Sequence, residues 1–530
     1  MTSRTMRAAA WAAVGVLGFG LASAALAQTP TRGGVLRVAV GSEPPTTDCH
    51  AANTFTVIHH LAPHYSFLVR FDAKNYPSIE GDLARDWTAS ADGLSYTFRL
   101  HQPVRFHDGS PLTAADVKAS YERIKTPPQG VNSPRREHFA GVTAIDAPDA
   151  ETVVFRLRAP DPSFLTKLAS PYNCIFSAAA LAADPRYPEK RILGSGPFEF
   201  VSRTPGSEWV GKRFEGYFRE GRPYLDGFRN ILLTGSAMLN ALQGGQVDAE
   251  FRGIAPAERD RLRQALGDRI QFAEGPWLSG FILSFNTEKA PFNDVRVRQA
   301  LALAIDRWGA AQPLSRISQI RYPGGLLRPG FDLSATNEEL QALPLMGRDM
   351  QRNRAEARRL LTEAGQSNLR FVLGSRTLPP YPTAAQFLID QWRQIGVTVE
   401  QTNLETAAYF SAMSSGNFDA IIDFSTEFAD EPNLQWVKYI SMDRSPPPLN
   451  SARFTDRELD RLFDAQSGEL DRAKRRVTLR QMEAHLINQA YMVPLFWFER
   501  IVPMAASVRG WDFTPSHLLN QDLGAVWLAR

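Results

Sequence analysis

Ser195 stands in the run Gly194-Ser195-Gly196-Pro197, where a serine in a glycine-rich turn is a candidate nucleophile. A nucleophile elbow requires one residue between the serine and each glycine, whereas here both glycines are its immediate neighbours. The run also lacks the Gly-Lys-Ser/Thr end of a phosphate loop. We therefore interpret it as a tight structural turn. Because neither G-x-S-x-G nor H-E-x-x-H is found, a hydrolase is disfavoured and we expect a protein that is not an enzyme.

The first 27 residues have the pattern of an export signal. Arg4 and Arg7 precede an apolar stretch over 8–22, and Ala25-Leu26-Ala27 matches an A-x-A cleavage site. A membrane anchor is the competing interpretation, but the stretch ends at a cleavage motif instead of a charged stop. No cysteine adjoins the motif, so a lipid anchor is not indicated. We expect cleavage after Ala27 and a periplasmic product.

Export determines the chemistry of the only two cysteines, Cys49 and Cys174. In an oxidising compartment such a pair either forms a disulfide or stays buried as thiols, and we expect the disulfide. No histidine stands at a spacing that would complete a metal site. His59 and His60 are adjacent on an expected helix, where their side chains point about 100° apart. The sequence therefore predicts no metal site.

Length and composition favour a globular protein with more than one core. The chain has 530 residues, 44% hydrophobic and 22% charged, which exceeds the usual size of one core. Its formal net charge is +3, and no concentrated basic stretch predicts binding to nucleic acid. Aromatic residues make up 10% of the chain. We expect most of them in the core and some along a ligand pocket.

The stretch 81–124 shows how the elements are specified. Residues 94–100 alternate apolar and polar side chains, which is typical of a half-buried strand. Thr113 and Asp116 then form a capping-box pattern at the start of a helix. Farther on, Asn293 or Asp294 caps a second helix, in which apolar residues recur at helical spacing and the arginines are interpreted as a solvated face.

The order of these segments resembles the family 5 extracellular solute-binding proteins, the periplasmic receptors of ABC importers for dipeptides, oligopeptides and nickel. The resemblance covers residues 33–530, with its motifs in the same order along the chain. The stretches that carry it are 81–124, Gly194-Ser195-Gly196-Pro197-Phe198, Pro291–Arg307 and Gly416-Asn417-Phe418-Asp419.

The resemblance implies the architecture of a type II periplasmic binding protein, cluster C-like. This is an α/β fold of two lobes, with mixed sheets flanked by helices and a ligand cleft between the lobes. We expect lobe I at 28–275, including a family-specific extra subdomain, lobe II at 276–493, and a return to lobe I at 494–530. The crossovers near Trp277 and Pro494 would act as a hinge. The implied partners are an inner-membrane ABC permease with its ATPase subunits, and we expect a monomer without a cofactor.

The family also implies where the ligand binds. Its peptide-binding members hold the peptide ammonium with an aspartate four residues before a proline. That position before Pro432 is Phe428, so Glu427, Asp430 or Glu431 would have to replace the aspartate. The ligand is then a peptide or peptide-like solute. The alternatives are an oligosaccharide, an opine or aromatic conjugate, a metal chelate, or a role as a chemoreceptor ligand carrier. The expected pocket residues are His50, Trp277, Phe424, Glu427, Asp430, Glu431 and Trp436.

Overall fold

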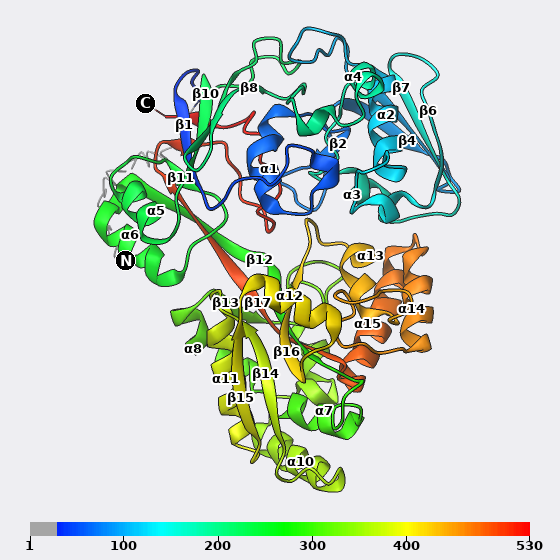
Figure 1. Cartoon of the computed structure of the whole chain (residues 1–530), viewed down its shortest axis with the longest axis vertical. Helices are drawn as coiled ribbons and strands as arrows, with labels where there is room; N and C mark the ends of the chain where they lie inside the picture. The colour runs from blue at the N-terminus through cyan, green and yellow to red at the C-terminus, as the bar shows by residue number, and fades with distance from the viewer. Residues whose placement is uncertain (1–28, 530) are drawn as a thin grey trace, which may run out of the picture.

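The computed structural model describes residues 29–529, which form two lobes joined by a narrow waist (Figure 1). We call the upper half in that view lobe I and the lower half lobe II. The expected export signal lies outside the described residues. Within residues 29–529, no helix combines the length and the apolar character needed to cross a bilayer.

Two long neighbouring strands connect the lobes. β12 (Ile270–Phe285) and β17 (Met492–Ala505) pair antiparallel, and Figure 1 shows both passing through the waist. In lobe I, β17 also pairs with β11 (Ala249–Glu250), whereas in lobe II β12 pairs with β16 (Ala420–Thr426). Their mutual register is interrupted between Pro276 and Gly280, and such irregularities bend a strand. The expected lobe boundaries at 275/276 and 493/494 fall inside these two strands.

These strands belong to one 11-stranded sheet with the order β15-β14-β16-β12-β17-β11-β1-β10-β9-β8, and β13 pairs with β17. The sheet is mixed, because β1 runs parallel to β10 and β11 while β12 and β17 run antiparallel. The remaining strands of this sheet are β1 (Val35–Val40), β8 (Phe198–Thr204), β9 (Glu208–Arg213), β10 (Gly227–Leu232), β13 (Ile320–Pro323), β14 (Arg370–Arg376) and β15 (Thr398–Leu404).

Lobe I carries a second sheet, of order β4-β5-β7-β6, and the stretch that led the sequence analysis lies there. β5 (Ser95–Leu100) buries Tyr96, Phe98 and Leu100, as the alternation predicts. Helix α2 (Ala114–Lys125) begins after Thr113, whose backbone N–H donates to the Asp116 carboxylate at 2.7 Å. The other strands are β4 (Ala84–Ala89), β6 (Val142–Asp146) and β7 (Thr152–Leu157), and the helices are α1 (Phe55–Leu61), α3 (Phe164–Leu168), α4 (Ala178–Ala183), α5 (Gly235–Gln243) and α6 (Pro256–Leu266).

Lobe II corrects one prediction about its first helix. α7 (Val295–Leu303) is capped by Asp294, as expected, but the arginines are not all solvated. Arg298 is buried and donates to the carbonyls of Phe292 and Gln489, and Arg307 is buried against backbone carbonyls. A planar guanidinium can satisfy several carbonyls at helix and strand ends, which offsets its burial. The other helices are α8 (Arg307–Ile317), α9 (Asn337–Gln341), α10 (Met350–Glu363), α11 (Tyr381–Arg393), α12 (Thr406–Ser415), α13 (Pro432–Gln435), α14 (Arg457–Ser467) and α15 (Arg472–Gln489).

The hydrophobic cores follow the two lobes. The largest cluster of lobe I packs α1, α2 and the second sheet together and extends to the C-terminal segment, while the largest cluster of lobe II packs α7, α10 and α11 on the sheet. Phe428 and Ala429, which follow β16, nevertheless join the lobe I cluster. The 427–434 segment of lobe II therefore contacts lobe I and closes one side of the molecule.

Candidate functional site

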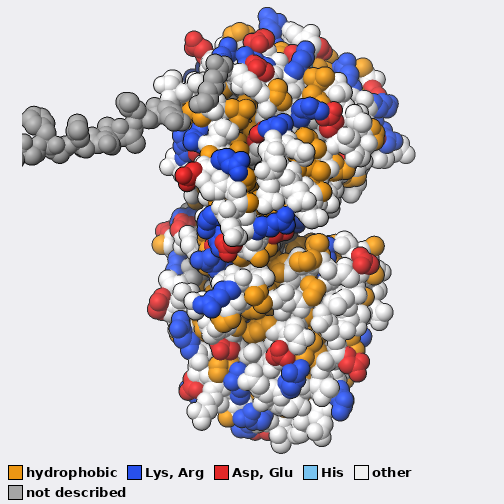
Figure 2. Space-filling model, turned by 90° about the vertical axis from the view of Figure 1, so that its left-hand side faces the viewer, with side chains coloured by type: hydrophobic (Ala, Val, Ile, Leu, Met, Phe, Trp, Pro, Cys, Tyr) orange, Lys and Arg blue, Asp and Glu red, His pale blue; other side chains and the backbone are white. Residues whose placement is uncertain are grey.

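A cavity of 390 Å³ lies at the edge of the main sheet that faces lobe II. Because β1, β10 and β11 are parallel, their carboxyl ends meet at this edge, which is where α/β proteins place ligands. Loops after these strands, α1 and the C-terminal segment line the cavity from lobe I, and Leu378 lines it from lobe II. Figure 2 shows the waist of the molecule, with basic side chains bordering it and hydrophobic side chains gathered on the lobe II side. We call this cavity and its rim the cleft.

The loop after β11 brings two opposite charges to the cleft. The Glu250 carboxylate accepts hydrogen bonds from the backbone N–H groups of Arg252 and Gly253, at 3.0 and 2.7 Å. Burial raises the pKa of Glu250 despite these bonds. Gly253 has φ +134°, and a Cβ there would lie 3.3 Å from Arg500. The Glu250 carboxylate is therefore bound by backbone N–H groups of its own loop. It forms no ion pair with the Arg252 guanidinium.

Arg252 is held by aromatic rings rather than by an acid. Its guanidinium carbon lies 4.8 Å from the Phe55 ring centroid and 5.8 Å from the Trp277 ring centroid. Although the Arg252 side chain reaches solvent, the protein packed around it lowers its pKa, while Glu250 raises the pKa and Arg376 of lobe II lowers it further. Its side chain is exposed inside the cleft and makes no hydrogen bond or ion pair with any described residue.

The histidines beside Arg252 are neutral. His59 of α1 lies on the cavity, and its Nε2 is 3.1 Å from Nδ1 of His517. Burial lowers the pKa of His59 to about 3, and nearby Arg252 and Arg500 lower it further. Burial likewise holds the pKa of His517 well below its usual range. Arg500 is itself bound to backbone carbonyls, among them those of Thr514 and Arg252. This side of the cleft thus combines the Arg252 guanidinium with the Glu250 carboxylate and two histidines whose pKa values are lowered by burial.

Lobe II contributes a second arginine, Arg376, at the end of β14. Its Nη2 donates to Thr406 at 2.9 Å, and its guanidinium carbon lies 5.2, 5.4 and 5.7 Å from the ring centroids of Tyr381, Tyr409 and Phe410. No ion pair joins Arg376 to an acid among the described residues. It therefore resembles Arg252 in stacking on rings without a carboxylate partner.

A row of buried aromatic rings runs from Arg252 to Arg376. Trp277 contacts Phe498, Phe498 contacts Phe281, and Phe281 contacts Tyr381, with centroid separations of 6.2, 4.7 and 4.6 Å. These rings stand on or beside β12 and β17, so they continue from one lobe to the other. We call them the aromatic floor. All four rings are buried in the core of lobe II, and none of them lines the cavity.

Two of the three acids expected to meet the ligand are paired inside the protein. The Asp430 carboxylate accepts from Arg328 at 2.7 Å and from the Tyr76 hydroxyl of lobe I at 3.0 Å. The Glu431 carboxylate forms an ion pair with Arg475 and caps α13 through the N–H of Asn433. All these charged groups are buried. Their positions make them structural, and they have little capacity left for a ligand.

Glu427 differs from the other two acids because no arginine or lysine forms an ion pair with it among the described residues. It is half-buried, and burial raises its pKa to about 7, while Arg135 and Lys438 pull the pKa back down. The neighbouring Phe428 is buried in the core of lobe I. Where peptide-binding relatives are expected to carry an aspartate, this chain thus has a core residue.

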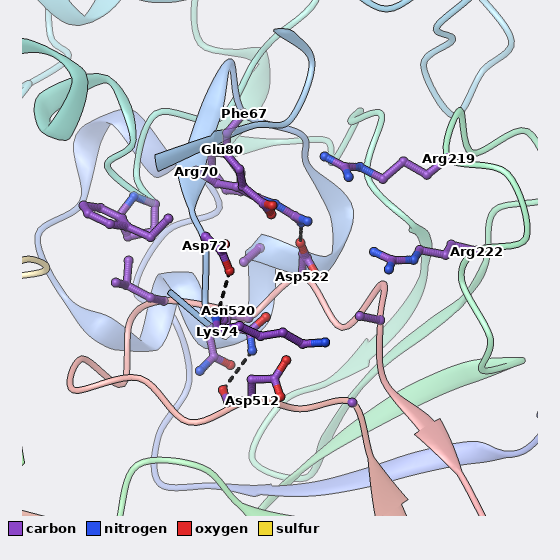
Figure 3. A pocket seen from close by; sticks show the side chains of 18 of the residues that line it. Phe67, Arg70, Asp72, Lys74, Glu80, Arg219, Arg222, Asp512, Asn520 and Asp522 are labelled. Carbon is purple, nitrogen blue, oxygen red and sulfur yellow. Dashed lines mark hydrogen bonds and ion pairs between the residues drawn. The ribbon is translucent and has the colours of Figure 1, made fainter. Parts of the chain in front are cut away.

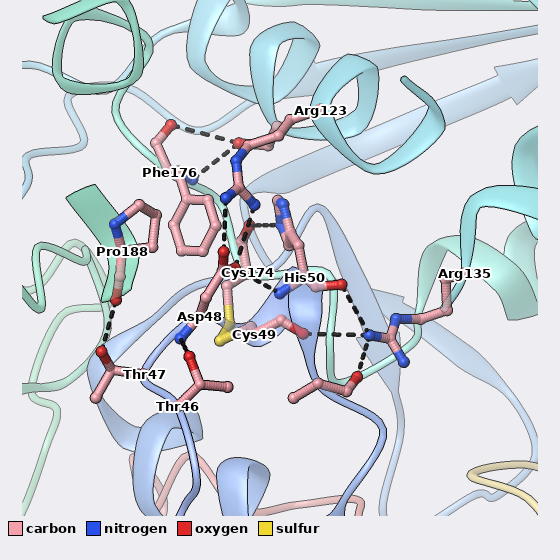
Figure 4. Close-up of a disulfide and its surroundings, with 12 residues drawn as sticks. Thr46, Thr47, Asp48, Cys49, His50, Arg123, Arg135, Cys174, Phe176 and Pro188 are labelled. Carbon is pink, nitrogen blue, oxygen red and sulfur yellow. Dashed lines mark hydrogen bonds and ion pairs between the residues drawn. A yellow bond between two sulfur atoms is a disulfide. The ribbon is translucent and has the colours of Figure 1, made fainter. Parts of the chain in front are cut away.

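His50 and the cysteines lie in lobe I and do not line the cavity of the cleft; Figure 4 shows their surroundings. Cys49 and Cys174 are joined in a disulfide with their Cα atoms 6.1 Å apart. His50 is completely buried beside it, with Nε2 2.9 Å from the Cys174 carbonyl oxygen and its ring against Phe176. Burial holds the pKa of His50 well below its usual range. The structure therefore does not bring His50 to the cavity that we assign to the ligand.

The three expected aromatic residues occupy different depths. Trp277 belongs to the aromatic floor next to Arg252. Phe424 is half-buried on β16 and contacts Phe410 at 6.1 Å, beside Arg376. Trp436 is fully buried in a core cluster of lobe II. Trp277 therefore contacts a residue of the cavity lining, Arg252, but none of the three aromatic residues lines the cavity itself.

A second cavity, of 440 Å³, lies entirely within lobe I (Figure 3). Its lining comes from the hairpin β2 (Val69–Phe71)–β3 (Ile79–Gly81), the turn around 219–224 and the C-terminal segment. Arg70 forms ion pairs with Glu80 and Asp522, and Arg219 with Asp82. Since no group of lobe II lines this cavity, a solute held there would not draw the lobes together. We therefore place the candidate site in the cleft.

Ser195 has a structural environment. Gly196 donates its N–H to the His64 carbonyl at 3.0 Å, and Cβ atoms at 194 and 196 would lie 1.9 and 2.5 Å from the His64 backbone. The His64 ring is occupied by the Phe198 carbonyl and the Trp209 N–H. The glycines are therefore required by close backbone packing, and His64 is not free to act as a base for the serine.

Sequence analysis missed both cleft arginines. Arginines in loops are usually solvated, so composition gives them no special weight. Their positions immediately after β11 and at the end of β14 were the available signal, because carboxyl ends of parallel strands gather around ligands.

Comparison with known proteins extends these observations. Residues 78–443 match the model described as bacterial extracellular solute-binding proteins, family 5 Middle. The chain is 28% identical over 485 residues to Heme-binding protein A of Haemophilus influenzae, covering 85% of this chain and 84% of that protein. It is 27% identical over 502 residues to the probable D,D-dipeptide-binding periplasmic protein DdpA of Escherichia coli, covering 91% and 92%.

Solved structures share the fold. The periplasmic binding protein DppA of Helicobacter pylori, in complex with the peptide STSA, superimposes with a TM-score of 0.78 at 22% identity. The match covers 94% of this chain and 99% of that one.

Proposed function

The chain belongs to the bacterial extracellular solute-binding proteins of family 5, and we propose that it binds a peptide or peptide-like solute in the cleft and delivers it to an ABC importer. Family and fold are those of substrate-binding proteins rather than enzymes. The relatives are named for heme and for D,D-dipeptides, and the solved structure holds a peptide. Membership in the family therefore supports the receptor role more strongly than any one ligand.

The observation that carries the proposal is a cavity lined by residues of both lobes, among them Arg252 of lobe I and Leu378 of lobe II. Arg252 forms no ion pair with an acid among the described residues, so its guanidinium is available to a ligand. The lobes are joined by β12 and β17, whose register breaks at the crossover. A solute that contacts both lobes shifts the population from open to closed.

The proposal includes the partners and the location of the protein. A mature chain beginning at Gln28 would work in the periplasm, as a monomer, with an inner-membrane permease and its ATPase subunits. Family members are extracellular or periplasmic. The closed lobes would present the surface that the permease recognises.

A thermal-shift screen of the mature chain tests the receptor function. The solutes are di- to pentapeptides, amino-acid conjugates, oligosaccharides and aromatic acids. A ligand present at about 100 times its Kd stabilises the folded state by about 2.7 kcal/mol. Small-angle scattering of the best hit should show a smaller radius of gyration as the lobes close. Failure of every solute to shift the transition or to compact the protein would overturn the proposal.

A further inference from the structure

We propose that the 440 Å³ cavity of lobe I is a second solute site, which binds a free α-amino acid by its carboxylate and its ammonium. Arg222 and Lys74 are the cations for the carboxylate, and Asp512 is the acid for the ammonium. Apolar residues of the lining surround the amino-acid side chain. The site is separate from the cleft and adds a second ligand to the proposed receptor function.

Three parts of lobe I enclose this cavity. They are the β2–β3 hairpin with its loop, the turn around 219–224 and the C-terminal segment 510–527. Figure 3 shows Arg219 and Arg222 extending from one side into the space that Lys74 enters from the other side. The volume lies in the range of small-molecule pockets, about 300–1,000 Å³. Charged side chains from separate segments therefore meet around a space large enough for a solute.

Two of the four cations in the lining already have acidic partners. Arg70 forms ion pairs with Glu80 and Asp522, and Arg219 forms one with Asp82 at 3.0 Å. These pairs join the hairpin to the C-terminal segment and to the turn around 219–224. They hold the walls of the cavity together and do not require a ligand.

The other two cations, Arg222 and Lys74, have no such partner. Arg222 is half-buried and Lys74 is exposed, and neither side chain forms a hydrogen bond or ion pair with any described residue. The Nε of Arg219, beside them, is also buried without a hydrogen-bond partner. A guanidinium binds a carboxylate through parallel hydrogen bonds, and an ammonium adds a point charge. This part of the cavity can therefore bind a carboxylate.

Asp512 supplies the opposite charge. Its carboxylate is half-buried and has no hydrogen bond or ion pair with the residues that the structure describes. Its backbone carbonyl accepts from Nδ2 of Asn520 at 2.9 Å, which leaves the Asn520 side-chain oxygen as a further acceptor. The carboxylate of Asp72, by contrast, is bound by Asn75 and by N–H groups of its own loop. Asp512 is thus the acid available to an ammonium.

The balance of charges favours a zwitterion over a simple anion or cation. The lining contains four basic and four acidic side chains, so a solute with a single charge would meet as many like charges as opposite ones. Separate positive and negative groups complement a solute that carries both charges. Phe71, Leu518 and Trp527 also line the cavity and provide apolar surface for a side chain such as that of leucine.

The C-terminal segment separates this cavity from the cleft. Gln521 lines both cavities, Trp511 and Leu523 line the cleft, and Asp512 and Asp522 line the lobe I cavity. An occupant would therefore contact the wall of the cleft. Because the whole lining belongs to lobe I, this occupant would not draw the lobes together. Binding without closure distinguishes the second site from the cleft.

Leucine and two derivatives test the requirement for both charges. Calorimetry of the mature chain compares L-leucine with L-leucinamide, which lacks the carboxylate, and with N-acetyl-L-leucine, which lacks the ammonium. We expect leucine to bind, and each derivative to bind about tenfold more weakly or worse. Small-angle scattering should show an unchanged radius of gyration when leucine binds.

Variants assign each charge to a residue. Arg222→Gln should weaken leucine about tenfold and remove the discrimination against leucinamide, while N-acetyl-leucine remains the weaker ligand. Asp512→Asn should do the reverse. The matched control is Arg99→Gln, which removes an exposed arginine of β5 outside the cavity lining and should bind leucine like the unaltered protein. Melting transitions verify that all three variants fold.

Three results would overturn the second site. They are no leucine binding at up to about 10 mM, leucine binding that compacts the protein, and unchanged leucine affinity in both cavity variants. Leu-Leu, whose two charges lie farther apart, tests a dipeptide instead. If the variants weaken Leu-Leu and not leucine, the amino-acid class is wrong. The receptor function is tested independently, because it requires a solute of the thermal-shift screen that does compact the protein.

Discussion

Arginines lie near both the disulfide of lobe I and the cleft, but their guanidiniums contact different kinds of groups in the two regions. Near the disulfide, Arg123 donates to the Asp48 carboxylate at 2.6 Å, and Arg135 donates to the carbonyls of Cys49, His50 and Ala52 (Figure 4). In the cleft, Arg252 and Arg376 lie on aromatic rings without an acid. A buried charge that is paired with an opposite charge contributes to folding stability. A charge without such a partner beside a cavity can instead pair with a ligand.

The largest effect is expected from breaking the buried pair in lobe I. Arg123→Met leaves the completely buried Asp48 without its partner, which should cost about 3–5 kcal/mol of the free energy of unfolding. Denaturant unfolding followed by fluorescence measures it. The double variant Asp48→Asn/Arg123→Met should recover part of the loss. A single-variant loss below about 1 kcal/mol would contradict the interpretation of this site as structural.

Removing the disulfide should have the next largest effect. Cys49 and Cys174 are 125 residues apart, so the bridge restricts a long loop in the unfolded chain. Replacing both by serine should lower the free energy of unfolding by about 2–4 kcal/mol, and solute binding by the folded variant should persist. Thiol labelling of the unreduced, unfolded wild type provides the control, because two labelled cysteines would show that the bridge does not form.

Glu427 is intermediate between the paired charges near the disulfide and the unpaired arginines of the cleft. It is a half-buried acid that lies near Arg135 without forming an ion pair with it. Its pKa of about 7 exceeds the usual value of 4.5, so the folded state retains the proton between these two pH values. Stability should therefore fall as the pH rises from about 4.5 to 7, and the full penalty is present above 7. Glu427→Gln should stabilise the protein by about 1–3 kcal/mol at pH 8 and little at pH 4.

Denaturant unfolding at several pH values measures this difference. The control is Glu400→Gln on the exposed strand β15, which should change stability by less than about 0.5 kcal/mol at every pH. If Glu427→Gln is as sensitive to pH as the wild type, another group carries the effect, and Glu427 is as solvated as a surface acid.

Local elements could be predicted from the sequence, whereas the charge partners of buried residues could not. Periodicity and caps predict β5, α2 and α7, because strands and helices depend on local patterns. The motif order predicts crossovers near Trp277 and Pro494, and both residues lie on the strands that join the lobes. The choice of charge partners is not local. Asp48 is paired with Arg123 and Asp430 with Arg328, residues 75 and 102 positions away.

This difference accounts for the site residues in particular. The acids of the 427–432 segment have the same types whether they bind a ligand or an internal arginine, so their composition could not separate Glu427 from Asp430 and Glu431. The burial of Arg298 likewise depends on a carbonyl at Gln489, far along the chain. The segment contacts lobe I through Phe428, and tertiary pairing decides what each acid does.

The smallest effect on stability is expected from the cleft arginines, and it is the sharpest test of the contrast. Stacking on rings contributes about 0.5–1 kcal/mol for an exposed cation, and removing one of two like charges returns a similar amount. Arg252→Gln and Arg376→Gln should therefore each change the free energy of unfolding by less than about 0.5 kcal/mol without solute. The control is Arg348→Gln, which removes an exposed lobe II arginine that lies 5.0 Å from the Trp308 ring centroid and should change stability as little. Denaturant unfolding at low and high salt measures this, since screening weakens any repulsion that the variants relieve. A loss above about 2 kcal/mol in either variant would mean that the guanidinium has a structural partner, and the cleft would then resemble the disulfide site. A change near zero, together with a large loss of solute affinity, is the combination expected only of groups whose partner is the ligand.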